Sequence, residues 1–321
     1  MIKPTNAPQS LPHDPRLYCD YAQLVRMQAH ATSFNLLPNA KIGAPLDGRH
    51  SSKLRGRGLN FEELRHYQLG DDIRNLDWKV TLRTGKPHVR GYSEEKDRNV
   101  ILCVDQRSSM FFASIEVMKS VIAAEVAALI GWRALRESDR VSSFIITDHG
   151  IQKVKATRNQ GGFLAFLKKL SKSNLILKAQ RSNANAPSLS NLLQQLSRLG
   201  SSGNTIFILS DLSDMTEIDI DRLHALQRNN DIIPIIITDP IEQALPSQLI
   251  EIQWRVGDGD YQISLDSEKQ RQIINQSFSS RAQSRAQNLS RLLSSKKLPL
   301  IELTTDGEHI RQFTQCAGGH A

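Results

Sequence analysis

The sequence predicts an α/β protein built on a doubly wound, mostly parallel sheet, preceded by an N-terminal layer that is helical and irregular. After residue 99, short apolar runs alternate with longer segments of helical periodicity, a pattern typical of strands that are buried on both faces. Before residue 99, glycine and arginine interrupt every short segment. We therefore divide the chain into residues 1–98, a helix followed by a Gly/Arg-rich region, and residues 99–321, the α/β domain.

Each element of this fold follows from a local pattern. Apolar positions between residues 16 and 37 recur at helical spacing and stop before Pro38, which predicts a helix. In the α/β domain, Ser114 is the expected N-cap of the first long helix. The expected order there is strand 100–104, helix 114–135, strands 140–147 and 152–156, helices 162–170 and 189–199, strand 205–209, helix 218–228, strands 232–237 and 249–254, helix 268–293, strand 298–303 and helix 307–315.

Size and composition place the chain among ordinary globular proteins. Its 321 residues are 39% hydrophobic and 23% charged, which is enough for at least one full core. The longest apolar stretch, residues 120–132, contains Glu125 and is much shorter than the roughly 20 apolar residues of a membrane-spanning helix. The first residues lack an apolar signal segment, and the three cysteines are scattered. We therefore expect a cytoplasmic protein without a membrane span.

The net charge of +8 raises the question of nucleic-acid binding, since clustered Lys and Arg side chains gain affinity by displacing counterions from phosphates. Charges of both signs are interleaved over residues 49–98, however, and are not collected in blocks. This pattern favours an ion-paired surface, so we expect no nucleic acid as a partner.

Two carboxylates follow strands whose carboxyl ends meet in a sheet of this kind. Asp105 comes directly after the first strand of the domain, and Asp211 follows the central strand. Ligands bind outside the carboxyl ends of parallel strands, at the point where the strand order reverses. Because Asp and Ser oxygens are ligands that magnesium prefers, the sequence predicts a crevice lined by Asp105 and Asp211. Further oxygen donors in the same two loops are Ser109, Ser213 and Asp214.

This arrangement resembles the metal-ion-dependent adhesion site of von Willebrand factor A domains. In that family the first loop reads Asp-x-Ser-x-Ser, a second loop supplies a Thr, and a third supplies an Asp. Here residues 105–109 read Asp-Gln-Arg-Ser-Ser, so Arg107 stands in the first Ser position. A guanidinium has no acceptor lone pair and repels a metal ion. Asp105, Ser109 and Asp211 match the family's ligands, and Ser188 is the candidate for the second-loop Thr.

The sequence leaves three states of this crevice open. Magnesium binds despite the arginine, or Arg107 folds back between Asp105 and Asp211 and takes the place of the cation, or the two aspartates are simple capping and ion-paired residues. The last two states contain no metal. Because Arg107 disfavours the first, we expect a degenerate site without a cofactor. The first would permit a different class of protein, a magnesium-dependent phosphoesterase or nuclease that uses Asp105 and Asp211.

A second pattern in the N-terminal region is more specific. Residues 70–79 read Gly-Asp-Asp-Ile-Arg-Asn-Leu-Asp-Trp-Lys, after a basic Gly-rich lead at residues 49–61 and before Arg-Thr-Gly at residues 83–85. In this order, ahead of a strand that ends in the metal-site loop, these segments resemble the bacterial domain-of-unknown-function family number fifty-eight. The resemblance runs from about Leu17 to the end of the chain and is strongest over residues 49–110. It implies association with MoxR-type AAA+ ATPases.

The acidic and basic side chains of this pattern are within reach of one another on a short helical turn. Asp71, Asp72, Arg74 and Asp77 are predicted to form an ion-paired clasp that fixes the N-terminal layer to the sheet domain, with Trp78 as its apolar anchor. A docking surface is the alternative. No G-x-S-x-G, Walker A or H-E-x-x-H signature occurs in the sequence. We therefore expect a non-enzymatic adaptor that works with such an ATPase in a chaperone-like or assembly complex.

Overall fold

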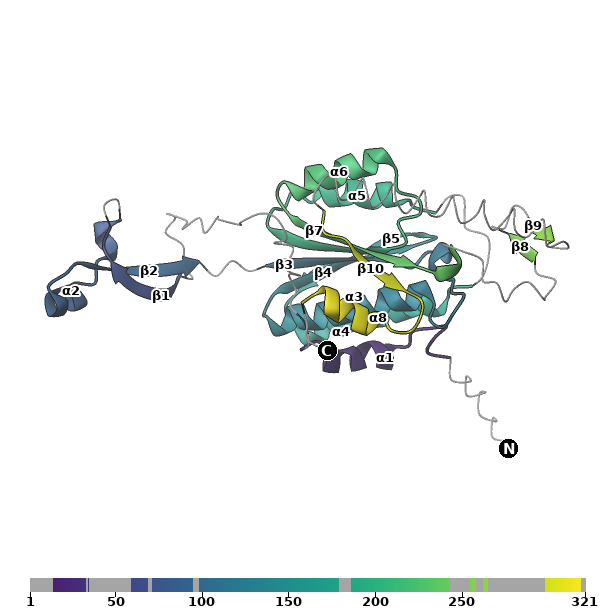
Figure 1. Ribbon diagram of the computed structural model, residues 1–321, viewed down its shortest axis with the longest axis horizontal. Coiled ribbons are helices and arrows are strands. Elements are labelled where there is room, and N and C mark those ends of the chain that lie inside the picture. Colours follow the sequence, from purple (N-terminus) through teal and green to yellow (C-terminus); the bar gives the residue numbers. More distant parts are fainter. Residues whose placement is uncertain are drawn as a thin grey trace, which may run out of the picture. The chain divides into compact units, whose positions relative to one another are not determined.

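The computed structural model of the chain describes residues 14–32, 34, 59–68, 71–94, 98–178, 186–242, 255–257, 262–264 and 298–318 (Figure 1). The chain forms two compact units, a larger one of residues 1–40 and 98–321 and a smaller one of residues 41–97. The expected strand 249–254 and helix 268–293 and the basic Gly-rich lead before residue 59 lie outside the described residues.

The structure divides the chain differently from the boundary expected at residue 98, because the N-terminal helix belongs to the sheet domain. Helix α1 (Tyr21–Arg26) and the 3₁₀ turn η1 (Met27–His30) lie against the long helix of the larger unit. Leu24 is fully buried, and its carbonyl oxygen accepts a hydrogen bond from Trp132 Nε1 at 3.1 Å. Only the Gly/Arg-rich region forms a separate unit.

A six-stranded sheet lies at the centre of the larger unit. Its spatial order is β10-β7-β6-β3-β4-β5, and every neighbouring pair is parallel except β4 and β5. The chain builds outward from β3 through β4 and β5, and then in the other direction through β6, β7 and β10, so the order reverses between β3 and β6. This confirms the doubly wound sheet. The strands are β3 (Asn99–Asp105), β4 (Arg140–Thr147), β5 (Gly150–Thr157), β6 (Asn204–Ser210), β7 (Asp231–Thr238) and β10 (Ile301–Thr304).

Helices cover both faces of this sheet, with α3, α4, α8 and α1 on one face and α5 and α6 on the other (Figure 1). Their bounds are α3 (Lys119–Arg136), α4 (Gln160–Leu175), α5 (Leu189–Arg198), α6 (Glu217–Gln227) and α8 (His309–Cys316). Among the described residues, none of these helices has the length and apolar character needed to cross a bilayer.

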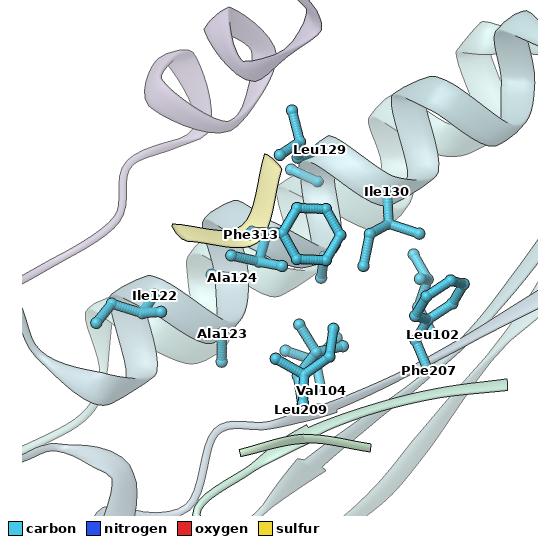
Figure 2. Close-up of a cluster of buried hydrophobic side chains, with 14 of the residues drawn as sticks. Leu102, Val104, Ile122, Ala123, Ala124, Leu129, Ile130, Phe207, Leu209 and Phe313 are labelled. Atoms are coloured by element: carbon cyan, nitrogen blue, oxygen red, sulfur yellow. The ribbon is translucent and has the colours of Figure 1, made fainter. Parts of the chain in front are cut away.

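Helix α3 forms the centre of the core on its face of the sheet. Most of its circumference is apolar, and nearly all of its side chains are buried. Fully burying one large aliphatic side chain contributes about 1.5–3 kcal/mol, so this helix supplies a large share of the stability of the unit. Figure 2 shows Ala123 and Ile130 of α3 pointing toward Leu102 and Val104 of β3 and Phe207 and Leu209 of β6, whereas Leu129 points away from the sheet. Phe313 of α8 belongs to the same buried cluster.

The prediction that this helix begins at Ser114 was wrong, because it begins five residues later. The Ser114 amide and hydroxyl both donate to the carboxylate of Asp239, at the end of β7. The amides of Glu116 and Val117 donate to the carbonyl of Thr305. These bonds hold the segment against the ends of β7 and β10 and delay the first helical turn to Lys119.

The smaller unit is a β-hairpin with a short helix. Strands β1 (Leu59–His66) and β2 (His88–Glu94) pair antiparallel, and η2 (Ile73–Asn75) and α2 (Trp78–Thr84) lie between them in sequence. Asp77 caps α2, because its Oδ1 accepts from the Val80 amide at 3.1 Å. Gly85 ends the helix at a φ of +69°, a left-handed conformation that glycine adopts without steric cost. A separate two-stranded pair consists of β8 (Arg255–Gly257) and β9 (Gln262–Ser264).

Candidate functional site

The carboxyl ends of β3 and β6 meet where the strand order reverses, as the sequence predicts for the crevice. Asp105 is the last residue of β3 and is completely buried. Ser210, the last residue of β6, donates from its hydroxyl to Asp105 Oδ2 at 2.7 Å. A carboxylate without solvent is stable only when charges and donors surround it, so the other partners of Asp105 decide what this site can do.

Arg107 folds back onto Asp105, and its guanidinium group also binds two further partners. Its Nε donates to Asp105 Oδ1 at 3.0 Å, and its Nη2 donates to Oδ2 at 2.6 Å. On the opposite side, Nη1 and Nη2 donate to the two carboxylate oxygens of Asp214 at 2.7 and 3.1 Å. The remaining Nη1 hydrogen bond goes to the carbonyl of Pro187 at 3.2 Å. Because a guanidinium has five N–H donors, all of them are engaged.

This buried cluster shifts the pKa of each of its members. Burial raises the pKa of Asp105, and the hydrogen bonds and charge of Arg107 oppose that rise. Burial alone would lower the pKa of Arg107, but Asp105 and Asp214 outweigh it and hold that pKa above its ordinary value. Burial would raise the pKa of Asp214, but Arg107 and the Leu189 amide keep it below its ordinary value. Arg107 therefore carries a fixed positive charge between two carboxylates.

Asp211 is paired with Lys119. Lys119 Nζ lies 3.8 Å from Asp211 Oδ2 and hydrogen-bonds to Oε1 of Glu242. The Lys119 side chain is only 1% exposed. In one of the three states that the sequence leaves open, Arg107 lies between Asp105 and Asp211; in the structure its second partner is Asp214. The reason lies in Leu212, which has a φ of +51° and a buried side chain, so the loop turns sharply between the two aspartates.

The remaining predicted ligands lie in other roles. Ser188 is the N-cap of α5 and forms a reciprocal capping box with Asn191, so it stabilises the helix end. Ser213 is exposed, and its amide donates to Asp211 Oδ1 at 3.0 Å. Ser109 is partly exposed within the 3₁₀ turn η3 (Ser108–Met110). The structure therefore brings together Asp105, Arg107 and Asp214. Pro187 and Leu189, which flank Ser188, both hydrogen-bond to this cluster, while the Ser188 side chain itself caps α5.

Sequence reasoning missed three polar groups at this edge. The hydroxyl and amide of Ser108 both donate to Asp148, which follows β4. Asp239 follows β7 and is fully buried, and Thr305 Oγ1 donates to it at 2.6 Å. The sequence places Lys119 in a helix that is apolar on most of its circumference, with no role at the site. A signal for Asp148, Asp239 and Lys119 was present. Asp148 directly follows the predicted strand 140–147, Asp239 comes two residues after the predicted strand 232–237, and Lys119 directly precedes the longest apolar run.

These residues do not fit the magnesium ion that the adhesion-site resemblance implies. Both oxygens of Asp105 already accept from Arg107, and a second cation beside a guanidinium would be repelled. Asp211 and Asp214, the other carboxylates of the site, are each paired with a basic side chain. Within the described part of the chain, no group of three or more His, Cys, Asp or Glu side chains is placed to hold a metal.

The predicted clasp residues pair inside the smaller unit. Asp71 forms a two-point ion pair with Arg65 at 2.7 and 2.8 Å, and Asp77 accepts from Arg90 Nε at 2.8 Å. Arg74 lies 3.9 Å from its neighbour Asp72, and both are largely exposed. Trp78 is 62% exposed and does not anchor a core. The arginines that bind Asp71 and Asp77 therefore come from the hairpin strands, and a clasp to the sheet domain stays a prediction.

Comparison with known proteins gives this chain a family. Residues 63–287 match the family described as "Protein of unknown function DUF58". The chain belongs to this family. Relatives of this DUF58 chain include the uncharacterized proteins Rv1480 of Mycobacterium tuberculosis (strain ATCC 25618 / H37Rv) and Mb1516 of Mycobacterium bovis (strain ATCC BAA-935 / AF2122/97). Each is 30% identical over 131 residues, which are 41% of this chain and 41% of the relative. The chain thus spans about two fifths of the curated relatives that it matches.

Solved structures similar to the DUF58 chain have low sequence identity to it. The conserved hypothetical protein BatB from Bacteroides thetaiotaomicron is 13% identical, with 69% of this chain and 97% of that chain covered and a TM-score of 0.38. The SpRpn10 VWA domain is also 13% identical, with 70% and 100% covered and a TM-score of 0.37. The chemistry of the site rests on the contacts within this chain.

Proposed function

We propose that this DUF58 chain is a non-enzymatic protein-interaction adaptor that binds its partner at the carboxyl edge of the sheet. One observation carries the proposal: among the described residues of the larger unit, six large hydrophobic side chains remain exposed, and all but Tyr21 lie in segments that adjoin this edge. They are Leu17, Tyr21, Phe112, Ile115, Ile176 and Ile218. We call this set the apolar rim. Exposed apolar side chains that gather in one place mark an interaction surface.

The position of the apolar rim follows from the chain's own contacts. Phe112 and Ile115 lie between the end of β3 and the start of α3, and Ile218 is in the first turn of α6 after β6. Ile176 is two residues from Asn174, whose side chain donates to Gln106 Oε1 at 3.0 Å beside Asp105. Leu17 is held at the same edge, because the Arg16 carbonyl accepts from the Met118 amide. Five of the six rim residues therefore lie in segments that adjoin the carboxyl edge of the sheet.

The internal ion pairs favour a partner that binds the rim and not the crevice. Arg107 has no N–H left for an acidic group of a partner, and Lys119 is almost completely buried. A partner that entered the crevice would have to break buried ion pairs, which costs about 3–5 kcal/mol for each lost charge partner. The same engagement disfavours the alternative, a magnesium-dependent phosphoesterase or nuclease that uses Asp105 and Asp211.

The family resemblance supports a MoxR-type AAA+ ATPase as the partner, in a chaperone-like or assembly complex. Biolayer interferometry between the full chain and the purified MoxR-type ATPase of the same organism tests this. We expect binding, weakened about tenfold or more by Ile115→Ser or Ile218→Ser, because truncating a central apolar contact costs more than about 1.4 kcal/mol. Arg140→Ser is the control, since Arg140 is exposed at the amino end of β4.

The same preparations decide between the adaptor and the enzyme. Equal affinity in all three variants, or no binding of the ATPase at all, would contradict the proposal. Magnesium-dependent release of phosphate from p-nitrophenyl phosphate that disappears in Asp105→Asn would favour the phosphoesterase instead.

A further inference from the structure

Helix α2 of the smaller unit presents an apolar stripe and a basic stripe side by side. Trp78 and Leu82 are one helical turn apart and are 62% and 82% exposed. Lys79 and Arg83 have the same spacing, one residue further on, and both are exposed. Residues four apart lie on the same side of a helix, so the two stripes run parallel to the helix axis. We call these four side chains the α2 face.

The opposite side of α2 is occupied by contacts within the unit, so the orientation of the helix is fixed. Thr81 Oγ1 accepts from the His88 amide at 3.0 Å, and Thr84 Oγ1 lies 3.2 Å from His88 Nδ1. Asp77 holds the first turn and is itself bound by Arg90. Trp78 and Leu82 are therefore exposed because the opposite side of α2 packs against β2.

The charge of this face selects its occupant. Lys79 and Arg83 form no ion pair with any described residue, and the next exposed charge along the chain, Lys86, is also basic. A surface that combines two apolar anchors with exposed cations is complementary to an apolar segment that carries carboxylates. We propose that the α2 face binds an acidic amphipathic helix of a partner protein, with Trp78 and Leu82 against its apolar side chains and Lys79 and Arg83 against its carboxylates.

Two other occupants fit less well. A second copy of this chain carries a net charge of +8, so electrostatic repulsion opposes self-association through a basic face. A nucleic acid would use Lys79 and Arg83 and could stack on Trp78, but it would leave the aliphatic Leu82 without a contact. Leu64 and Ile73 of the same unit are also exposed aliphatic side chains, which adds to the apolar character of the unit. The proposal rests on the smaller unit alone and does not need the apolar rim.

The test uses the full chain and a fluorescein-labelled peptide of about 15 residues, long enough to form a helix. The probe carries Leu at i and i+4 and Glu on the adjoining stripe, and a matched peptide carries Lys in place of Glu. We expect anisotropy to show micromolar binding of the Glu peptide that weakens with salt, and no binding of the Lys peptide. Trp78→Ser and Leu82→Ser should each weaken binding about tenfold or more.

Charge reversal distinguishes binding at the α2 face from a general attraction of the acidic peptide to a positively charged protein. Lys79→Glu combined with Arg83→Glu should abolish binding of the Glu peptide and create binding of the Lys peptide. The control is Arg136→Glu, an exposed arginine of α3 in the larger unit, which should change nothing. All of these side chains are exposed, so the variants should keep the thermal midpoint of the wild-type chain.

Four results would overturn the proposal. The first is failure of the wild-type chain to bind the Glu peptide, and the second is equal binding by the Trp78→Ser chain. The third is a single-stranded oligonucleotide that competes with the Glu peptide for the α2 face and no longer binds after the charge reversal. The fourth is concentration-dependent dimerisation that Trp78→Ser removes, which would assign the face to a second copy. If the apolar-rim variants lose ATPase binding but still bind the Glu peptide, the apolar rim and the α2 face are distinct binding surfaces.

Discussion

A guanidinium differs from a divalent cation because it is covalently attached and cannot dissociate. Arg107 therefore holds Asp105 and Asp214 together at any concentration of free metal. Its fifth hydrogen bond, to the Pro187 carbonyl, adds the segment before α5 to the loops after β3 and β6. Three loops at the carboxyl edge are thus held by one side chain.

Because this pair is buried, we expect the effects of substituting Arg107 and Asp105 on stability to be non-additive. Arg107→Met leaves Asp105 buried without its cation, and we expect a loss of about 3–5 kcal/mol in the free energy of unfolding. Adding Asp105→Asn removes the unpaired charge, so the double variant should be more stable than Arg107→Met alone. Urea unfolding measures both. A double variant that is less stable than the single one would show that Asp105 is stabilised by something other than Arg107.

At this scale the sequence predicted the kind of interaction but not every partner. The return of Arg107 to Asp105 was foreseeable, because a carboxylate directly after a buried strand needs a counter-charge and arginine stands two residues away. The choice of Asp214 over Asp211 was not, because it depends on the left-handed backbone of Leu212. Leucine rarely adopts that conformation, so nothing in the loop's residue types announces the turn.

Among the elements, the N-terminal segment contributes more to the core than its short helix suggests. Cys19, Leu24, Ala31 and Phe34 are all at most 3% exposed. The ring of Phe34 meets that of Phe313 of α8 edge to face, with centroids 5.1 Å apart. Gln23 also donates to Glu125 of α3, whose other oxygen is 2.6 Å from His309 Nε2. The segment therefore joins α3 and α8 through both apolar and polar contacts.

Truncation tests this contribution. Deleting residues through Lys41 removes all of these contacts, whereas trimming to Pro12 removes none of them, so only the longer deletion should lower the thermal midpoint. Leu24→Ala alone should cost about 2–5 kcal/mol, because it opens a cavity beside Trp132. Tyr21→Ala, at a side chain that is 39% exposed, is the control. Identical midpoints for the two truncations would contradict the packing.

The strands and helices of the larger unit were predictable because buried strands appear as unbroken apolar runs. The prediction of strand 205–209 corresponds to β6 (Asn204–Ser210), and helix 218–228 corresponds to α6 (Glu217–Gln227). Helix ends were harder wherever a long-range contact competes with a local cap. Ser114 has the sequence of an N-cap, but Asp239, more than a hundred residues away, binds it instead.

For the whole molecule, the ionised carboxylates at the carboxyl edge predict a loss of stability in acid. Burial would raise the pKa of Asp239, but hydrogen bonds from Ser114 and Thr305 outweigh it and hold that pKa below its ordinary value. The pKa of Asp214 is also lowered. A lowered pKa in the folded state stabilises the protein above the ordinary value of about 3.9, and this contribution is lost as the pH falls below it.

Urea unfolding from pH 6 downward measures this effect. We expect the midpoint of the wild-type chain to fall as the pH drops through the ordinary carboxyl range. The fall should be smaller in Asp239→Asn, which no longer takes up that proton on unfolding. Parallel curves for the two chains would show that Asp239 contributes no pH dependence to stability.

Arg107 takes the place of a metal ion at this edge of the sheet, and thermal melts test this replacement directly. The wild-type chain should have the same midpoint in chelator, in millimolar magnesium and in millimolar manganese. Arg107→Ser supplies the family's ligand and leaves Asp105 and Asp214 unneutralised, so it should melt lower in chelator and recover when metal is added. A ligand at tenfold its Kd adds about 1.4 kcal/mol to the folded state. A wild-type midpoint that rises and saturates with magnesium would contradict the account.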